Sequence, residues 1–181
     1  MASVLYHDFY ICGTCQAMVA EVERLRTELD TARWNPLLEM HNLAGGLAAI
    51  AALPHGRYAV VFCDIDRLKA LNSATGNHMQ TNRYLAAGLK VRQGEIAFQF
   101  LGDEIVFILT DQRGYADPAS FVERITAQLA AQPLTEEERR AIDGATLSAT
   151  FAWRADVAKH AILAMIERMS VEVLARKAAR P

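Results

Sequence analysis

Two short acidic clusters have the residue types and spacing to bind a metal ion. Asp64 and Asp66 directly follow an apolar run, and Asp103 and Glu104 lie between two further apolar runs. Carboxylates gathered at one edge of a sheet repel one another unless a cation is present, and hard oxygen ligands suit Mg²⁺ or Mn²⁺. Such an ion could activate an attacking hydroxyl and neutralise a pyrophosphate leaving group. The alternative is that these acids are only solvated charges at strand ends.

The apolar runs beside these clusters predict the strands that must position them. Residues 58–63 form a nearly continuous apolar run, as expected of a strand buried on both faces. Residues 96–100 and 105–109 predict a hairpin whose tip carries Gly102, which is free to adopt the positive φ of a tight turn. Residues 146–153 alternate and predict a further strand. Because the tip of a central hairpin lies beside the end of its neighbouring strand, we expect the two acidic clusters to meet.

Helical periodicity in the intervening segments completes an α+β fold. Apolar side chains predict helices over residues 38–53, 79–91, 121–129 and 162–173, and residues 133–144 are expected to form a loop or short helix. From the first predicted strand onward the order is β-α-β-β-α-β. This order is typical of the ferredoxin-like, palm-type fold, in which helices flank an antiparallel sheet.

Several segments of the chain resemble, in register, the motifs of the GGDEF family of diguanylate cyclases. The segments are residues 35–42 (family D-P-L-T-G-L-x-N), 61–72 (D-I-D-x-F-K-x-x-N), 101–105 (G-G-D-E-F), 148–152 (S-x-G-x-A), and Ala175, Arg176 and Arg180 (A-K-x-x-x-R). The resemblance covers about residues 33–180. It therefore predicts a GGDEF-like domain over residues 33–181, preceded by an N-terminal segment over residues 1–32.

The resemblance implies a metal and phosphate site built on the acidic clusters. Asp64 and Asp103 would ligate Mg²⁺ (or Mn²⁺), with help from the backbone carbonyl of Ile65. Glu104 would assist metal binding and remove the proton of a 3′-hydroxyl. Lys69 would steady the phosphates or the charge of the transition state.

The resemblance also implies substrate-binding residues, and here the sequence departs from the family. Asn72 would hydrogen-bond guanine, and Arg176 and Arg180 would hold the terminal phosphates. Thr81 stands where the family has an aspartate that binds the guanine edge. Leu101 replaces the first glycine of the signature, so its side chain could crowd the nucleotide. The metal and phosphate end of the site is therefore expected to be intact, and base selection altered.

A second nucleotide site is suggested shortly before the signature. Many diguanylate cyclases carry an R-x-x-D product-inhibition motif there, and this chain has Arg92 and Glu95 in that place. The resemblance thus implies an inhibitory site for cyclic di-GMP. The alternative is a helix-to-strand turn with two solvated charges.

The N-terminal segment predicts a helix with a coiled-coil seam. Its apolar residues recur in steps of four, three, four and three, which is heptad spacing; they are Met18, Val22, Leu25, Leu29 and Ala32. One interpretation is a homodimer through this helix. The other is an amphipathic helix that packs on its own domain.

Charge and cysteine content limit the remaining classes of partner. A formal net charge of -2 argues against non-specific nucleic-acid binding, and no apolar stretch is long enough to span a membrane. The first residues lack the pattern of a signal peptide, so the expected location is the cytoplasm. Cys12 and Cys15 are interpreted as reduced thiols, with an intermolecular zinc or redox clasp as the alternative.

Three functions remain open at this point. The leading hypothesis is an enzyme that condenses two GTP molecules into cyclic di-GMP, each subunit of a dimer holding one substrate. The second is a catalytically inactive module that binds a nucleotide or cyclic dinucleotide and signals. The third is a palm-type cyclic oligonucleotide synthase with a different base. The presence of Asp64, Asp103, Glu104 and Lys69 favours the first and third hypotheses, which are enzymes. Leu101 and Thr81 favour the second and third over the first.

Overall fold

The computed structural model describes residues 13–76, 78–110 and 117–179. The chain divides into two compact units, Met1–Ala32 and Arg33–Pro181. In the first, the structure describes α1 (Gly13–Ala32), and the second contains the sheet and its covering helices. Within the described residues, no helix is long and apolar enough to cross a membrane.

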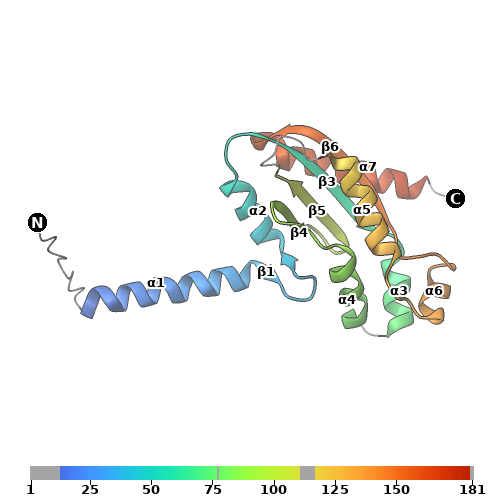
Figure 1. Ribbon diagram of the computed structural model, residues 1–181, viewed down its shortest axis with the longest axis horizontal. Coiled ribbons are helices and arrows are strands. Elements are labelled where there is room, and N and C mark those ends of the chain that lie inside the picture. Colours follow the sequence, from blue (N-terminus) through green and yellow to red (C-terminus); the bar gives the residue numbers. More distant parts are fainter. Residues whose placement is uncertain (1–12, 77, 111–116, 180–181) are drawn as a thin grey trace, which may run out of the picture. The chain divides into compact units, whose positions relative to one another are not determined.

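Six strands of the described chain form one sheet in the order β1-β2-β4-β5-β3-β6 (Figure 1). The strands are β1 (Trp34–Asn35), β2 (Met40–His41), β3 (Arg57–Ile65), β4 (Glu95–Gln99), β5 (Glu104–Leu109) and β6 (Ala149–Ala158). β3 lies between β5 and β6 and pairs with both in antiparallel fashion, and β4 pairs antiparallel with β5. These four strands confirm the predicted β-α-β-β-α-β order and the α+β fold.

Helices cover both faces of this sheet. The helices on one face are α3 (Leu68–Thr75), α4 (His78–Gly88), α5 (Pro118–Ala130) and α6 (Glu136–Ala141). Those on the other face are α2 (Leu43–Ala52) and α7 (Ile162–Ala178). Helix α7 follows the short 3-10 helix η1 (Lys159–Ala161). Val61 and Cys63 of β3 face the first core, whereas Val60 and Phe62 face the second. All four are 0% exposed, which explains the continuous apolar run of β3.

The helix predicted over residues 38–53 is wrong in its first turn. Leu38 and Met40 are buried, but Met40 belongs to the short strand β2, and the helix begins only at Leu43. Asn42 caps the helix, because its side chain accepts a hydrogen bond of 3.0 Å from the backbone N–H of Gly45. Asparagine is among the best N-cap residues, so the local chemistry overrides the apolar spacing.

Other elements also differ from the sequence analysis; the helix predicted over residues 79–91, for example, ends at Gly88. The strand predicted over residues 146–153 begins at Ala149 and continues to Ala158, because β6 follows β3 as far as the pair Arg57 and Ala158. Helix α3 was not predicted; it starts directly after Arg67, which has the left-handed φ of 57°. Tertiary pairing and an unusual backbone conformation decide β6 and α3, respectively. Residues 133–144, expected to form a loop or short helix, contain the short helix α6.

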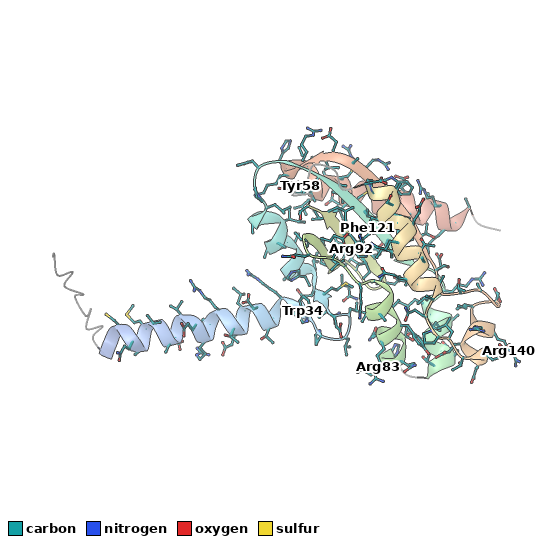
Figure 2. All side chains as sticks on the ribbon, in the orientation of Figure 1. Trp34, Tyr58, Arg83, Arg92, Phe121 and Arg140 are labelled. Carbon is teal, nitrogen blue, oxygen red and sulfur yellow. The ribbon has the colours of Figure 1, made fainter. Side chains whose placement is uncertain are left out.

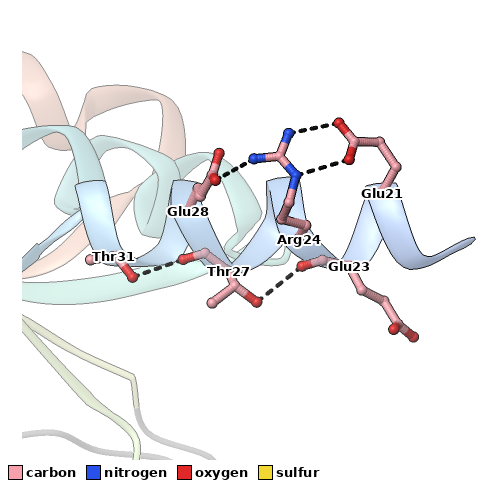
Figure 3. Close-up of polar contacts among 6 residues, drawn as sticks. All are labelled: Glu21, Glu23, Arg24, Thr27, Glu28 and Thr31. Atoms are coloured by element: carbon pink, nitrogen blue, oxygen red, sulfur yellow. Dashed lines mark hydrogen bonds and ion pairs between the residues drawn. The ribbon is translucent and has the colours of Figure 1, made fainter. Parts of the chain in front are cut away.

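Helix α1 carries the predicted heptad stripe and a set of polar contacts along its own surface. Figure 3 shows Arg24 between Glu21 and Glu28; Arg24 Nη2 lies 2.7 Å from Glu21 Oε1, and the guanidinium also pairs with Glu28. The stripe is exposed at Met18, Val22, Leu25 and Leu29. The short-range ion pairs therefore support the helix itself. Cys15 is also exposed on α1, Cys63 is buried in β3, and Cys12 lies outside the described residues.

Candidate functional site

The two acidic clusters lie side by side at one end of the sheet. Asp64 near the end of β3 is the register partner of Glu104 at the start of β5. The backbone N–H of Ile65 donates a 3.3 Å hydrogen bond to the carbonyl of Asp103. The hairpin tip turns at Gly102, whose φ of 54° is in the left-handed region that glycine tolerates best. The expected meeting of the clusters is therefore present, and antiparallel pairing produces it.

Burial raises the proton affinity of two of these carboxyl groups. Asp64 is only 4% exposed, and burial raises its pKa, helped by the negative charges of Asp103 and Asp66 and opposed by Lys177. Burial likewise raises the pKa of Glu104, and the hydroxyl of Ser170, which donates to Glu104 Oε1 at 3.2 Å, acts in the opposite direction. At this end of the sheet, the acidic corner formed by Asp64, Asp66, Asp103 and Glu104, carboxylate charge is thus costly without a cation.

Lys177 supplies a cation at this corner, and the sequence analysis did not single it out. Its ammonium donates to Asp64 Oδ1 and, at 3.0 Å, to the carbonyl oxygen of Ile65. It also lies 3.9 Å from Asp66 Oδ1. The sequence showed only that a second basic residue directly follows Arg176, because moving the closing motif by one place would put Pro181 where the family has its arginine.

Asp66 makes hydrogen bonds that support the local structure. Its two carboxylate oxygens accept hydrogen bonds from Ser148 Oγ at 3.0 Å and Thr150 Oγ1 at 2.8 Å. Its backbone N–H donates to the carbonyl of Ser148 at 3.0 Å. These bonds join the end of β3 to the start of β6. They fix the chain next to Arg67, after which α3 begins.

A cleft of about 630 Å³ opens beside Asp103. It is lined by Leu68, Lys69, Asn72, Ser73, Gly76, His78, Gly102 and Asp103. Three residues expected to act on a substrate, Lys69, Asn72 and Asp103, therefore border one cleft between α3 and the hairpin tip. Ser73 and His78 are additional lining residues that carried no expected role.

Thr81 and Leu101 do not line this cleft. Thr81 is 1% exposed, and its hydroxyl lies 3.4 Å from that of Thr75. Leu101 is 59% exposed at the hairpin tip. The structure thus places the Thr81 side chain inside the domain and that of Leu101 in solvent.

Arg176 points away from the acidic corner. Its guanidinium donates to the carbonyl of Phe151 at 2.5 Å and pairs with Glu172 one turn earlier on α7. Adjacent helical residues project about 100° apart, so Lys177 faces the carboxylates when Arg176 faces β6. Arg180 lies outside the described residues.

The corner offers two carboxylates and a carbonyl rather than a complete metal cage. In the part of the chain that the structure describes, no three His, Cys, Asp or Glu side chains come together as a metal-binding group. The hard oxygens of Asp64, Asp103 and Ile65 nevertheless match the partial sets with which Mg²⁺ binds together with phosphates. The contact of the Lys177 ammonium with Asp64 and Ile65 shows that positive charge fits at this corner.

The residues of the suggested inhibitory site line a separate pocket. Its volume is about 560 Å³, and its lining includes Arg92, Glu95 and Arg124; Figure 2 labels Arg92 and Phe121 in this region. Glu95 pairs with Arg124 at 2.6 Å rather than with the side chain of Arg92, whose backbone N–H donates to Glu95 at 2.6 Å. The Arg124 guanidinium also lies 4.9 Å from the ring centre of Phe121. Glu95 is therefore ion-paired with Arg124 within the pocket.

These features define the class of the protein: a palm-type α+β domain with clustered carboxylates at one end of its antiparallel sheet, beside a cleft that Asp103 borders. Residues 41–157 match the sequence model described as "Diguanylate cyclase, GGDEF domain", and the chain therefore belongs to the GGDEF family. A search of the curated proteins found no match.

Solved structures of other GGDEF proteins share the fold. The diguanylate cyclase SiaD of Pseudomonas aeruginosa, in complex with its activator SiaC, is 16% identical with a TM-score of 0.59, over 92% of this chain and 68% of SiaD. The GGDEF domain of DgcB from Caulobacter crescentus, in complex with c-di-GMP, is 24% identical with a TM-score of 0.57, over 81% of this chain and 88% of that one. The coiled coil and GGDEF domain of DgcB give 22% and 0.54, over 91% and 93%. At these identities the likeness concerns the fold.

Proposed function

We propose that this domain is a diguanylate cyclase that binds Mg-GTP and condenses two molecules into cyclic di-GMP. The observation that carries the proposal is the juxtaposition of Asp64 with Glu104 across β3 and β5, beside a cleft lined by Asp103, Lys69 and Asn72. Family membership supports the same activity. In the proposed reaction the 3′-hydroxyl oxygen of each GTP forms a bond to the α-phosphorus of the other, and two molecules of pyrophosphate leave.

Each residue has a role consistent with its position. Glu104 accepts the proton of the attacking hydroxyl, and its raised pKa suits a carboxylate that takes up a proton. Lys69 is exposed at the cleft, where its ammonium can reach the phosphates. Asn72 offers an amide to the base.

A divalent cation is part of the proposal. Asp64, Asp103 and the Ile65 carbonyl would hold Mg²⁺ or Mn²⁺, and the phosphates would complete its shell. When bound, the ion neutralises negative charge on the phosphates and lowers the pKa of a hydroxyl that it touches. The protein's own contribution is to keep these oxygens close together in a largely buried corner.

The reaction needs two bound substrates, and helix α1 offers a way to pair two domains. Each domain would hold one GTP, and a homodimer would bring the two together. The exposed stripe of Met18, Val22, Leu25 and Leu29 supports a two-stranded coiled coil. DgcB was crystallised with its coiled coil and GGDEF domain together, which supports the same arrangement here.

The test combines product analysis with calorimetry. Incubation of the purified protein with each Mg-NTP, followed by mass spectrometry, should yield cyclic di-GMP from GTP. Asp64→Asn should abolish Mg-dependent GTP binding while circular dichroism shows an intact fold. Asp156→Asn is the matched control, because this exposed acid pairs with Arg57 at the far end of β3. Equal Mg-GTP affinity in wild type and Asp64→Asn would disprove the site.

A second candidate is a non-catalytic nucleotide or cyclic dinucleotide module. The observation in its favour is the burial of Thr81: Asp103 alone carries a carboxylate among the described residues that line the cleft, so guanine lacks an acidic partner there. The pocket with Arg92 and Arg124 would then bind cyclic di-GMP. Binding of GTP or cyclic di-GMP without any product in the same incubations would favour this candidate. A cyclic product containing another base would favour a synthase with altered specificity.

A further inference from the structure

We propose that Lys177 is a positioning residue whose ammonium occupies the site of the divalent cation while no metal is bound. The ammonium must leave this site for the metal to bind. This inference rests on the metal site of the proposed function. Before metal binds, the ammonium keeps the Asp64 carboxylate and the Ile65 carbonyl together. When metal and phosphate arrive, the ammonium leaves these two oxygens.

Lys177 contacts two of the groups that would hold the metal. An ammonium has three donors, and here it donates to Asp64 Oδ1 and to the Ile65 carbonyl and lies 3.9 Å from Asp66 Oδ1. The Lys177 side chain is 25% exposed and that of Asp64 only 6%. A carboxylate removed from water to this degree is strongly destabilising when unpaired, so an internal cation is favoured as long as no other cation is present.

The position of Lys177 on α7 makes the contact specific to this residue. Met169 and Val173, both 0% exposed, anchor α7 on the sheet. Lys177 is one turn further along the same face, and this spacing aims its side chain at the end of β3. Its neighbour Arg176 is held by Glu172 and by the Phe151 carbonyl, so it is not placed to replace Lys177.

Competition between ammonium and metal has a consequence for the order of binding. A divalent ion on Asp64 and the Ile65 carbonyl would lie next to the Lys177 ammonium and repel it, so we expect the ion alone to have to displace Lys177. A lysine has a flexible four-carbon stem, which allows its head to move while α7 stays in place. Binding of the metal is therefore expected to be weak without a nucleotide and to be strengthened by the phosphates, whose charge compensates both cations.

The experiment measures metal binding without nucleotide or turnover. Mn²⁺ is titrated into metal-free protein, and the free ion is followed by electron paramagnetic resonance. Lys177→Gln, which removes the charge, should bind Mn²⁺ at least tenfold more tightly than wild type. Lys177→Arg should restore the weak binding. Arg176→Gln is the matched control, because it removes a neighbouring charge that does not contact Asp64, and it should behave as wild type.

Thermal unfolding provides a second readout. In EDTA, Lys177→Gln should unfold at a lower temperature than wild type, and Mn²⁺ should raise its midpoint by more than it raises that of wild type. If Lys177→Gln folds only when Mn²⁺ is added, the exchange is supported. If it stays unfolded with Mn²⁺, or if its Mn²⁺ affinity is no tighter than that of wild type, the proposal is overturned.

Asp64→Asn separates this inference from the proposed function. If it abolishes Mn²⁺ binding while Lys177→Gln binds as wild type does, the metal site stands and the role of Lys177 falls. If Asp64→Asn leaves Mn²⁺ binding unchanged, or if no variant binds Mn²⁺, the metal site itself is wrong and the inference falls with it.

Discussion

Replacement of Thr81 by aspartate tests whether this position can bind the guanine base at all. The family resemblance places Thr81 where an aspartate binds the guanine edge, and the substitution would then create selectivity for GTP. In the structure, however, Thr81 is 1% exposed, and its hydroxyl lies 3.4 Å from Thr75 Oγ1. We therefore expect Thr81→Asp to destabilise the domain without improving the discrimination between GTP and ATP.

The magnitude follows from the burial of an unpaired charge. An uncompensated carboxylate in the interior costs roughly 3–5 kcal/mol. The same free energy corresponds to a rise of about 2–4 units in the pKa of the introduced group, which would take up a proton. For a domain of this size, such a loss lowers the midpoint of thermal unfolding by roughly 6–20 °C.

The assay is urea unfolding of wild type, Thr81→Asp and Thr81→Asn as a function of pH. Asparagine has nearly the same volume as aspartate but no charge, so the difference between the two variants isolates the carboxylate. The raised pKa means that the folded state retains the proton that the unfolded chain loses. The difference should therefore be small at about pH 4 and grow as the pH rises toward 7.

One result would refute this reasoning. If Thr81→Asp is as stable as wild type at neutral pH and prefers GTP to ATP by tenfold or more in calorimetry, the side chain at position 81 turns into the cleft. The family resemblance would then describe the base site better than the packing of α4 does.

Three further predictions concern assembly, the second pocket and pH. Leu25→Glu should shift the protein from dimer to monomer in light scattering, because the charge lies in the exposed stripe of α1; a wild type that is already monomeric at high concentration with Mg-GTP would contradict the coiled coil. Arg92→Ala should weaken cyclic di-GMP binding more than tenfold in calorimetry, since Glu95 is occupied by Arg124 and leaves Arg92 as the cation for the ligand; equal affinities would leave Arg92 as a surface charge. The raised pKa values of Asp64 and Glu104 make the folded state bind more protons than the unfolded chain above their ordinary values of 3.8 and 4.5. Stability in EDTA should consequently fall as the pH rises from about 4 through the raised values, and Mg²⁺ should reduce this loss; urea unfolding with a pH-independent difference between EDTA and Mg²⁺ would oppose it.

The strands of the acidic corner could be predicted because their signals are local. Residues 58–63 of β3 form a nearly continuous apolar run, since Val61 and Cys63 face one core and Val60 and Phe62 the other. Gly102 marks the turn between β4 and β5, where the backbone has a positive φ of 54°. Helix α2, in contrast, was placed too early, because apolar spacing alone does not distinguish the buried Met40 of β2 from a helical residue.

The sequence by itself determined the α+β class, the meeting of Asp64 with the hairpin that carries Asp103 and Glu104, and the resemblance to the GGDEF family. The apolar runs that predict the strands and the turn residues between β4 and β5 are signals carried by residues close together in the chain. Tertiary structure alone decided that Lys177 rather than Arg176 contacts the carboxylates, and that Thr81 is buried. The rotation of α7 about its axis is set by the packing of Met169 and Val173, and that of α4 by Tyr84 and Leu85, against distant parts of the chain. A rotation of about 100° per residue exchanges which neighbour faces the site, and no motif spacing contains that information.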